Sequence, residues 1–346
     1  MITFDAVTKR YPDGTVAVDR LDLEAPTGEI TVLVGPSGCG KTTSLRMINR
    51  MIDATEGRIL LDGAPVQDID PPTLRRGIGY VIQQAGLFPH RKIVDNIATV
   101  PHLLGWDKKK ARARAMELLE RVGLDPGLAG RYPFQLSGGQ QQRVGVARAL
   151  AADPPVLLMD EPFSAVDPIV RTSLQDELLR LQAELNKTIV FVTHDIDEAI
   201  KLGDRVAVLR VGGKLAQVAD PKTLLSDPAD DFVREFLGRD RGIRRLQFIS
   251  TEGLRLRTDM TGDAAGPWRL VVDADGRPTG WVSRERPDEL EPYGTFVRGR
   301  DPMRSALDAA LLSPSGCAVA VDEDGKVVGV ATRETLDEAL AEAADG

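Results

Sequence analysis

A glycine-rich loop between an apolar run and a helical pattern constrains the fold of this chain more than any other feature. The loop extends from Gly35 to Thr42, after the β-branched run Ile30 to Val34 and at the start of a helical pattern over Lys41 to Met51. Glycines let the backbone turn tightly, so that successive N–H groups and the positive end of the helix point at an anionic phosphate. The order strand, loop and helix therefore predicts a phosphate-binding α/β fold.

Other apolar runs alternate with helical patterns over the first two thirds of the chain. Val156 to Met159 and Thr188 to Val192 are candidate buried strands, and Arg171 to Leu185 carries leucines on one helical face. Residues from about 85 to 150 have mostly helical patterns, which indicates an inserted helical subdomain. Alternation of this kind predicts a parallel sheet covered by helices.

The composition is that of a globular protein, because 42% of the residues are hydrophobic and 28% are charged. A length of 346 residues is enough for two or three domains. The longest apolar runs fall far short of the roughly 20 residues that a spanning helix needs, so we expect no transmembrane segment. Cys39 and Cys317 are the only cysteines, and Cys39 lies inside the glycine loop. We therefore expect no disulfide framework, which is typical of a reducing cytoplasm.

The net charge of −8 arises in the C-terminal part of the chain. Residues 246–346 include 19 acidic and 11 basic residues, whereas residues 1–245 include 33 of each. An acidic chain repels nucleic acid, so we expect no nucleic-acid partner. Four arginines between positions 239 and 245 form a short basic stretch that is typical of a solvated linker.

The C-terminal part contains an internal repeat with an offset of 49 residues between Asp273 and Asp322. Each copy combines an apolar strand, an Asp-x-Asp-Gly turn and a second strand, and the match extends to Arg284-Glu285 and Arg333-Glu334. Two copies of one small unit are therefore expected. The predicted organisation is a first domain at 1–238, a linker at 239–250 and a second, α+β domain at 251–346.

Four side chains around the loop have the chemistry that nucleotide hydrolysis needs. Lys41 can neutralise the β- and γ-phosphates, and the Thr42 hydroxyl can ligate Mg²⁺. Asp160 and Glu161 end the apolar run from Val156, which brings both carboxylates to the sheet edge beside the loop. Asp160 suits the magnesium shell, and Glu161 suits the orientation and deprotonation of an attacking water. We therefore predict a site for ATP and Mg²⁺.

His194 and Gln83 each follow a candidate strand, and position alone leaves their roles open. His194 comes after Thr188 to Val192, where a histidine is as often structural as it is a hydrogen-bond donor to a γ-phosphate. Gln83 follows Gly79 to Ile82, and most glutamines at strand ends are surface residues.

Taken together, these motifs resemble the ATP-binding subunits of ATP-binding cassette (ABC) transporters over about residues 2–238. The resemblance implies a P-loop NTPase core with an antiparallel β subdomain and a helical subdomain. The motifs occur in the family's order: Gly35 to Thr42 resembles the Walker A loop, Gln83 the Q-loop glutamine, Leu136 to Gln140 the family signature, Asp160-Glu161 the Walker B pair, Ser164 to Asp167 the D-loop and His194 the switch histidine.

The resemblance also implies the site residues. Catalytic roles fall to Glu161, His194, Gln83 and Lys41, and metal ligation falls to Thr42, Gln83 and Asp160. Tyr11 is similar to the aromatic residue that stacks on adenine. The implied ATP-binding residues are Tyr11, Gly35, Pro36, Ser37, Gly38, Cys39, Gly40, Lys41, Thr42, Thr43, Ser137, Gly138, Gly139, Gln140 and Asp167.

The same resemblance implies partners. In the family, the signature of one protomer closes over the γ-phosphate that the other protomer's Walker A loop holds, so a homodimer with two shared ATP molecules is expected. Gln83 and a groove near Phe88 to His90 are expected to contact transmembrane permease subunits, which places the chain at the cytoplasmic face of the cell membrane. An extracytoplasmic solute-binding protein then acts through the permease.

A narrower resemblance is to the ATPases of osmoprotectant importers, which take up glycine betaine, carnitine, choline or proline. It rests on Gly79 to Gln84, Asn96 to Pro101 and His194 to Ala199. Those subunits often end in paired cystathionine β-synthase (CBS) domains, which the repeat resembles and which regulate the importer. Thr335 and Arg286 stand near the points where such domains often place a ribose-binding Asp.

Three alternatives stay open at this point. The chain fits an importer ATPase for another solute, such as an amino acid or a polyamine, because nothing in a cytoplasmic motor touches the cargo. A non-transport ABC ATPase usually has two cassettes in one chain or a long coiled-coil insertion, and this chain has neither. The C-terminal domain fits a dimerisation module as well as a sensor.

Overall fold

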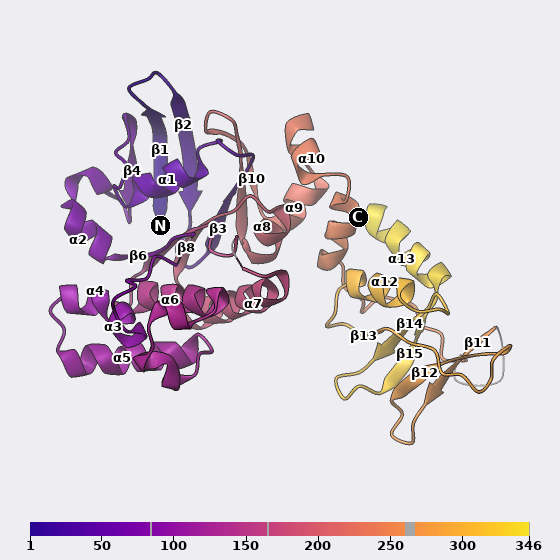
Figure 1. The fold of residues 1–346 in the computed structure, drawn as a ribbon. Coiled ribbons are helices and arrows are strands. Elements are labelled where there is room, and N and C mark those ends of the chain that lie inside the picture. Colours follow the sequence, from indigo (N-terminus) through magenta and orange to yellow (C-terminus); the bar gives the residue numbers. More distant parts are fainter. Residues whose placement is uncertain (84, 165, 260–266, 346) are drawn as a thin grey trace. The chain divides into compact units, whose positions relative to one another are not determined.

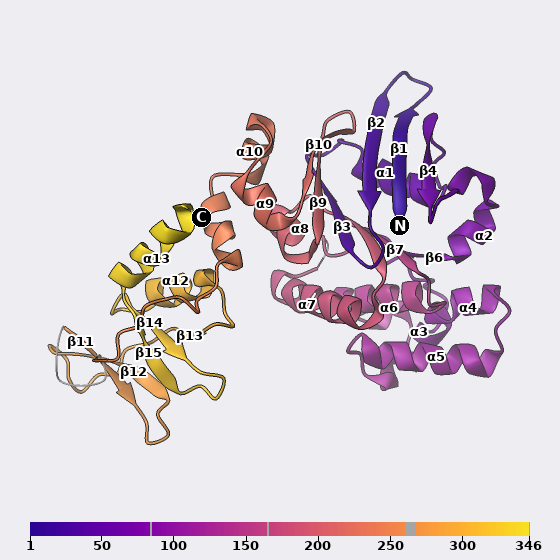
Figure 2. The ribbon, with the colours of Figure 1, turned by 180° about the vertical axis from the view of Figure 1, so that it is seen from behind.

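The computed structural model describes residues 1–83, 85–164, 166–259 and 267–345. Its contacts divide the chain into two compact units, Met1–Phe236 and Leu237–Gly346, which Figures 1 and 2 show from opposite sides.

An antiparallel sheet of strand order β2-β1-β4-β5 forms one layer of the first unit. Its inner side chains Phe4, Val18 and Ile59 are buried and belong to the same core as Leu45 and Ile48 of the first helix. The strands are β1 (Ile2–Arg10), β2 (Val16–Ala25), β4 (Glu56–Leu61) and β5 (Ala64–Pro65).

The second layer is a six-stranded sheet of order β10-β9-β3-β8-β7-β6, in which only β10 pairs in the antiparallel sense. Every residue of β3, β7 and β8 is buried, as expected for parallel strands covered on both faces. The strands are β3 (Ile30–Val34), β6 (Ile78–Val81), β7 (Val156–Asp160), β8 (Thr188–Val192), β9 (Arg205–Arg210) and β10 (Lys214–Ala219).

Helices cover both faces of this sheet. In Figures 1 and 2, α1 (Lys41–Ile48) lies on the side of the antiparallel sheet, and α6 (Gly138–Leu150) and α7 (Pro168–Leu185) lie on the other side. Leu158 belongs to the core that holds α1, whereas its neighbours Leu157 and Met159 line a small cavity with residues of α6 and α7. The side chains of β7 thus alternate between the two helical layers.

The first helix is shorter than its sequence pattern predicts. We expected it to extend from Lys41 to Met51, but it ends at Ile48 with Asn49 as its cap. Arg50 adopts a left-handed backbone conformation with φ of 53°, which cannot continue an α-helix. Its guanidinium donates to the carbonyls of Gln67 and Ile69, so a tertiary contact holds the residue that ends the helix.

Shorter helices complete the first unit. The segment predicted as a helical subdomain, about 85–150, contains α3 to α6. These and the remaining helices of the unit are α2 (Pro71–Arg76), α3 (Ile93–Ile97), α4 (Thr99–Leu103), α5 (Lys108–Arg121), α8 (Ile196–Leu202), α9 (Pro221–Ser226) and α10 (Asp231–Leu237), whose last residue already belongs to the second unit.

The segment that we expected to be a linker, residues 239–250, has structure of its own within the second unit. It contains α11 (Arg241–Arg245) and a 3-10 turn at Leu246–Phe248. Leu246 is buried in the core of that unit beside Phe296 and Met303. The basic stretch is therefore part of a folded element and not an extended tether.

The second unit contains two sheets, and the repeated sequence forms a hairpin in each. One hairpin joins β11 (Trp268–Val272) to β12 (Pro278–Ser283), and the other joins β14 (Ala318–Val321) to β15 (Val327–Ala331). The two turns are alike: the carboxylate of Asp273 or Asp322 accepts two backbone N–H groups, and the turn glycine has a positive φ.

The repeat ends with the hairpins. After β15, Arg333 opens α13 (Arg333–Asp345), whereas after β12 the matching Arg284 begins irregular structure that returns to Trp281 through a bridge at Glu291. Among the described residues, which leave out 260–266 before β11, only the second copy has a preceding strand and helix, β13 (Thr295–Val297) and α12 (Met303–Leu311). The two copies therefore share the hairpin, and the sequence match at Arg284-Glu285 and Arg333-Glu334 joins different structures.

None of the described helices has the length and apolar character needed to cross a membrane.

Leu45→Ala should test the packing that places α1 between the two sheets. Leu45 is fully buried, so truncation should lower the free energy of unfolding by about 2–5 kcal/mol in chemical denaturation. Leu311→Ala is the control, because Leu311 is 74% exposed and its truncation should change stability little. Equal effects of the two substitutions would contradict this packing.

Candidate functional site

The candidate site lies where four parallel strands end. Leu33 of β3 and Asp160 of β7 both pair with Val192 of β8, and Val81 of β6 pairs with Met159 of β7. The carboxyl ends of these strands therefore lie along one edge of the sheet, where α/β proteins usually bind ligands. This edge collects the Walker A loop, the Walker B pair, His194 and Gln83, as their positions after the strands predict.

Glycine is required sterically in the Walker A loop. Gly35 and Gly40 have φ values of 154° and 90°. A Cβ atom would lie 2.3 Å from the carbonyl oxygen of Leu209 at Gly35 and 2.2 Å from that of Ala17 at Gly40. Only glycine fits both contacts and both conformations. No side chain caps the N-terminus of α1, so its first N–H groups are available to an anion.

Lys41 is the buried cation of this loop. It is 6% exposed, and its ammonium donates to the carbonyl oxygens of Gly35 at 2.7 Å and Pro36 at 3.1 Å. The sulfur of Cys39 lies 3.7 Å from the same nitrogen, and burial raises the pKa of the Cys39 thiol. The loop thus curls around a fixed positive charge, which is the arrangement that polyphosphate binding needs.

Thr42 and Asp160 meet across the edge of the sheet. The Thr42 hydroxyl donates to Oδ1 of Asp160 at 2.9 Å, and Asp160 is 6% exposed. Its other oxygen accepts from the Tyr80 hydroxyl at 3.4 Å and lies 3.7 Å from the Arg46 guanidinium. Burial, and secondarily the Asp160 charge, raise the pKa of Tyr80, so its hydroxyl stays protonated as a donor.

Tyr80 and Arg46 were not predicted as site residues. Arg46 has a sequence signal, because it lies four residues after Thr42 on α1, and residues at that spacing share one face of a helix. Tyr80 has none, because its contact with Asp160 depends on β6 and β7 being neighbours in the sheet.

The donors at Thr42 and Asp160 fit Mg²⁺. A hydroxyl and a carboxylate within hydrogen-bond distance are hard oxygen ligands, and Mg²⁺ is usually held by one or two such groups together with phosphate oxygens and water. Across the described part of the chain, no cluster of three or more His, Cys, Asp or Glu side chains could hold a metal ion. Thr42 and Asp160 would therefore fit part of a Mg²⁺ coordination shell, with the rest left to phosphate oxygens and water.

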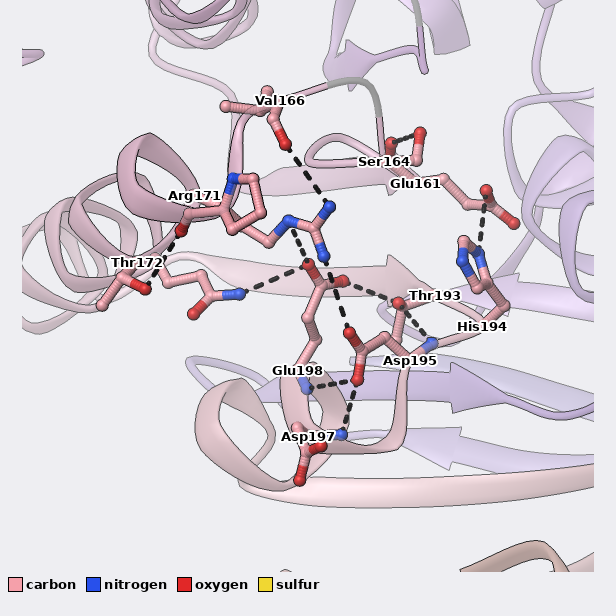
Figure 3. A network of polar contacts seen from close by, with 12 residues as sticks. Glu161, Ser164, Val166, Arg171, Thr172, Thr193, His194, Asp195, Asp197 and Glu198 are labelled. Atoms are coloured by element: carbon pink, nitrogen blue, oxygen red, sulfur yellow. Dashed lines mark hydrogen bonds and ion pairs between the residues drawn. The ribbon is translucent and has the colours of Figure 1, made fainter.

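Glu161 brings Gln83 and His194 together. Its Oε2 accepts from the Gln83 amide at 3.2 Å and lies 3.2 Å from Nδ1 of His194. Figure 3 shows the histidine ring turned toward this carboxylate. Glu161, the predicted base, thus contacts both Gln83 and His194, the predicted switch histidine. The metal-ligand role of Gln83 stays a prediction, since the hydrogen bond of its amide goes to Glu161.

The backbone of Glu161 is strained and held in place. Its φ of 47° is unusual for a residue with a side chain. Its N–H donates to the carbonyl of Val192 at 3.0 Å, and its carbonyl accepts from the Ser164 hydroxyl at 3.0 Å. Neighbours on both sides thus over-determine this conformation, which is typical of functional positions.

The signature forms the N-terminus of α6. The Ser137 hydroxyl accepts from the Gln140 N–H at 3.3 Å, and the Gln140 side chain accepts from the Ser137 N–H at 3.0 Å. This capping box pre-forms the first helical turn, and Gly138 and Gly139 follow Ser137 within that turn. Among the described residues, no hydrogen bond joins the signature to the Walker A loop of the same chain.

The remaining predicted residues lie around this edge or outside the description. Tyr11 follows β1, with the Lys9 ammonium 5.4 Å from its ring centroid. The carbonyl of Asp167 accepts from the Arg171 N–H at the start of α7. Thr43 is partly buried on α1. Ala165 of the D-loop and Gln84 after the Q-loop glutamine lie outside the described residues.

Comparison with known proteins places this site in a family. The pattern of the ABC transporter family matches residues 18–164. The chain is 44% identical, over 97% of its length and 95% of the relative, to the "Osmoprotectant import ATP-binding protein OsmV" of Salmonella typhimurium (strain LT2). It is also 44% identical, with the same two coverages, to the "Glycine betaine/carnitine/choline transport ATP-binding protein OpuCA" of Bacillus subtilis (strain 168). The chain belongs to the ABC transporter family.

A solved structure supports the fold of this ABC protein. The "Dimeric structure of a post-hydrolysis state of the ATP-binding cassette MJ0796 bound to ADP and Pi" is 35% identical, with a TM-score of 0.58. The match covers 99% of that chain and 64% of this one. The first unit is therefore an ABC ATPase cassette, and the protein is an ATP-hydrolysing enzyme.

Glu161→Gln should separate ATP hydrolysis from ATP binding in this ABC ATPase. The amide cannot accept a proton, so phosphate release should fall at least ~100-fold, while ATP binding and ATP-dependent dimers persist. Glu24→Gln is a matched control, because Glu24 is an exposed carboxylate on β2. Phosphate release at the wild-type rate from Glu161→Gln would contradict the predicted role.

Proposed function

We propose that this chain is the ATP-hydrolysing subunit of an importer for osmoprotectants such as glycine betaine, carnitine, choline or proline. The observation that carries the proposal is a likeness that extends beyond the cassette. Relatives named for osmoprotectant and for glycine betaine, carnitine and choline transport match over 97% of this chain, which includes the second unit.

The proposed chemistry is in-line attack of water on the γ-phosphate. Glu161 orients the water and accepts its proton, and Lys41 and His194 stabilise charge on the phosphate oxygens. Thr42 and Asp160, which share a hydrogen bond of 2.9 Å, would hold Mg²⁺ together with Gln83. When bound, Mg²⁺ would neutralise negative charge on the phosphates. Tyr11 stacks on the adenine.

ATP hydrolysis takes place in a homodimer in this proposal. Ser137, Gly138, Gly139 and Gln140 of one protomer contact the γ-phosphate held by the other, with Asp167 beside the shared nucleotide. Two observations support this. The capping box leaves the signature pre-formed at a helix N-terminus, and the related cassette MJ0796 is described as dimeric.

The other proposed partners are the permease subunits and, through them, an extracytoplasmic solute-binding protein. This places the chain at the cytoplasmic face of the cell membrane. The exposed Phe88, stacked under Arg91 at 4.9 Å, lies on the segment after Gln83 and is available to a permease helix.

The second unit is proposed to be a CBS-like regulatory domain. The order β13, α12, β14, β15, α13 forms one strand–helix–strand–strand–helix unit, and the described part of the earlier copy contributes the hairpin of β11 and β12. Trp281 and Leu270 of that hairpin share a core with Val319 and Val330. The Thr335 hydroxyl accepts from the Thr332 N–H at 3.0 Å, and the Thr332 hydroxyl accepts from the Thr335 N–H at 3.4 Å, so Thr335 takes part in capping α13 near the point where a ribose-binding Asp is often found.

Uptake by the assembled importer should identify the solute class. The chain, reconstituted in vesicles with its permease and solute-binding protein, should drive ATP-dependent accumulation of labelled glycine betaine, carnitine or choline. The same complex carrying Glu161→Gln should accumulate none. Accumulation of an amino acid or a polyamine, with no uptake of quaternary amines, would contradict the proposed cargo and favour an importer for another solute.

Deletion of residues 239–346 should test the regulatory role of the second unit. If the unit senses ionic strength, the truncated importer should transport at a rate that no longer depends on salt, while the full-length importer keeps that dependence. A salt response that survives the deletion would exclude sensing by this unit. Loss of dimers in the truncated chain would favour a dimerisation module.

A further inference from the structure

Glu198 is a buried carboxylate that is not among the residues proposed above to act in ATP hydrolysis. It lies on α8, is 5% exposed, and accepts hydrogen bonds at both oxygens: from the Thr193 hydroxyl at 2.6 Å and from the Gln175 amide at 3.3 Å. Burial raises its pKa, and the hydrogen bond from Thr193 opposes that shift most strongly. A buried carboxylate with this many partners is costly to desolvate, so its partners define its place.

The residues that Glu198 holds flank His194. The Thr193 hydroxyl donates to Glu198 and accepts from the Asp195 N–H at 3.0 Å. The Asp195 carboxylate in turn accepts the N–H groups of Asp197 at 2.8 Å and Glu198 at 3.4 Å, which caps α8. Figure 3 shows this ring of contacts beside the His194 side chain. The backbone on both sides of His194 is therefore fixed through Glu198.

Arg171 of α7 connects this ring to the loop that follows Glu161. Its guanidinium donates to the Val166 carbonyl at 3.4 Å and lies 3.7 Å from the Asp195 carboxylate and 4.0 Å from Glu198. Its backbone N–H donates to the carbonyl of Asp167 at 2.8 Å. One residue thus contacts both the end of the D-loop and the loop that carries His194 (Figure 3).

Stability alone is a weak reason for such a pair. Ion pairs contribute little net stability when they are partly exposed, and Arg171 is 29% exposed, so the contribution of Arg171 and Glu198 is better sought in orientation. The group they orient is close to the chemistry, because Nδ1 of His194 lies 3.2 Å from Glu161. A displacement of ~1 Å at a catalytic group can reduce a rate by ~100-fold.

We infer that Glu198 and Arg171 are positioning residues for ATP hydrolysis, which fix His194 against Glu161 and connect it to Val166 and Asp167. Their effect passes through Thr193 and Asp195 to His194, and it is independent of the solute that is transported.

The first test is steady-state ATP turnover of the full-length chain. Glu198→Ala should lower kcat about tenfold or more and change the KM for ATP by less than about twofold, because it misplaces a group used in the hydrolytic step. Glu198→Gln, which keeps an acceptor for Thr193, should recover part of the loss. Glu184→Gln, which removes an exposed carboxylate from the ion pair with Arg180 on α7, should leave kcat unchanged. Unchanged kcat in Glu198→Ala would overturn the inference.

A double-mutant cycle tests whether the effect passes through His194. Once His194→Ala has removed the positioned group, adding Glu198→Ala should lower kcat no further, because residues that act as a unit are not additive. The same result is expected for Arg171→Gln. A full additional loss in either double variant would show an independent structural effect and would overturn the inference.

NMR of the histidine side chains tests the inference without measuring ATP turnover. The chain has three histidines, at positions 90, 102 and 194, so NMR of histidine-labelled protein should resolve each imidazole. Glu198→Gln should shift the His194 signals and leave those of His90 and His102 in place. If Glu198→Ala does not fold, Thr193→Val and Thr193→Ser replace it as the test. Valine removes the hydroxyl that donates to Glu198 and should shift the His194 signals, whereas serine retains the hydroxyl and should leave them in place. Unmoved His194 signals in both Glu198→Gln and Thr193→Val would overturn the inference.

Discussion

Parallel pairing of β3, β8, β7 and β6 is the constraint on which the site depends. Val192 pairs with Leu33 on one side and Asp160 on the other, and its carbonyl accepts the Glu161 N–H. The Thr193 N–H donates to the Leu33 carbonyl. A shift of one residue in any of these strands would turn Asp160 or Val34 to the opposite face of the sheet, so the register of the core also sets the geometry of the chemistry.

Local patterns were sufficient to predict the elements that carry the site. Ile30–Val34 and Thr188–Val192 have the bounds that their apolar runs predict, because fully buried parallel strands leave no alternative placement for such runs. The end of α1 was predicted wrongly, since the pattern of apolar residues continues past Ile48. Contacts of Arg50 with Gln67 and Ile69 end the helix, and no helical pattern records a contact of that kind.

Contacts between side chains that lie far apart in the chain could not be predicted from the sequence. Tyr80 and Asp160 are 80 residues apart, and their contact depends on β6 and β7 being neighbours. Arg171 and Glu198 lie on separate helices, where each would be expected to face solvent. The repeat shows what a local pattern predicts and where that prediction ends. Its hairpins are alike because Asp273 and Asp322 dictate the turn locally, but Arg284 and Arg333 begin different structures because the packing around them differs.

The two halves of the site are held by different kinds of force. The phosphate loop is held by its own backbone: the Lys41 ammonium donates to the carbonyls of Gly35 and Pro36, and close carbonyls at Gly35 and Gly40 leave room for glycine alone. The hydrolytic half is held by polar side-chain contacts between loops, from Gln83 and His194 to Glu161 and from Arg171 to Val166 and Asp195. A substitution at either glycine would therefore disturb the backbone of the phosphate loop, whereas a substitution in the hydrolytic half would remove one side-chain contact and leave the strand ends in place.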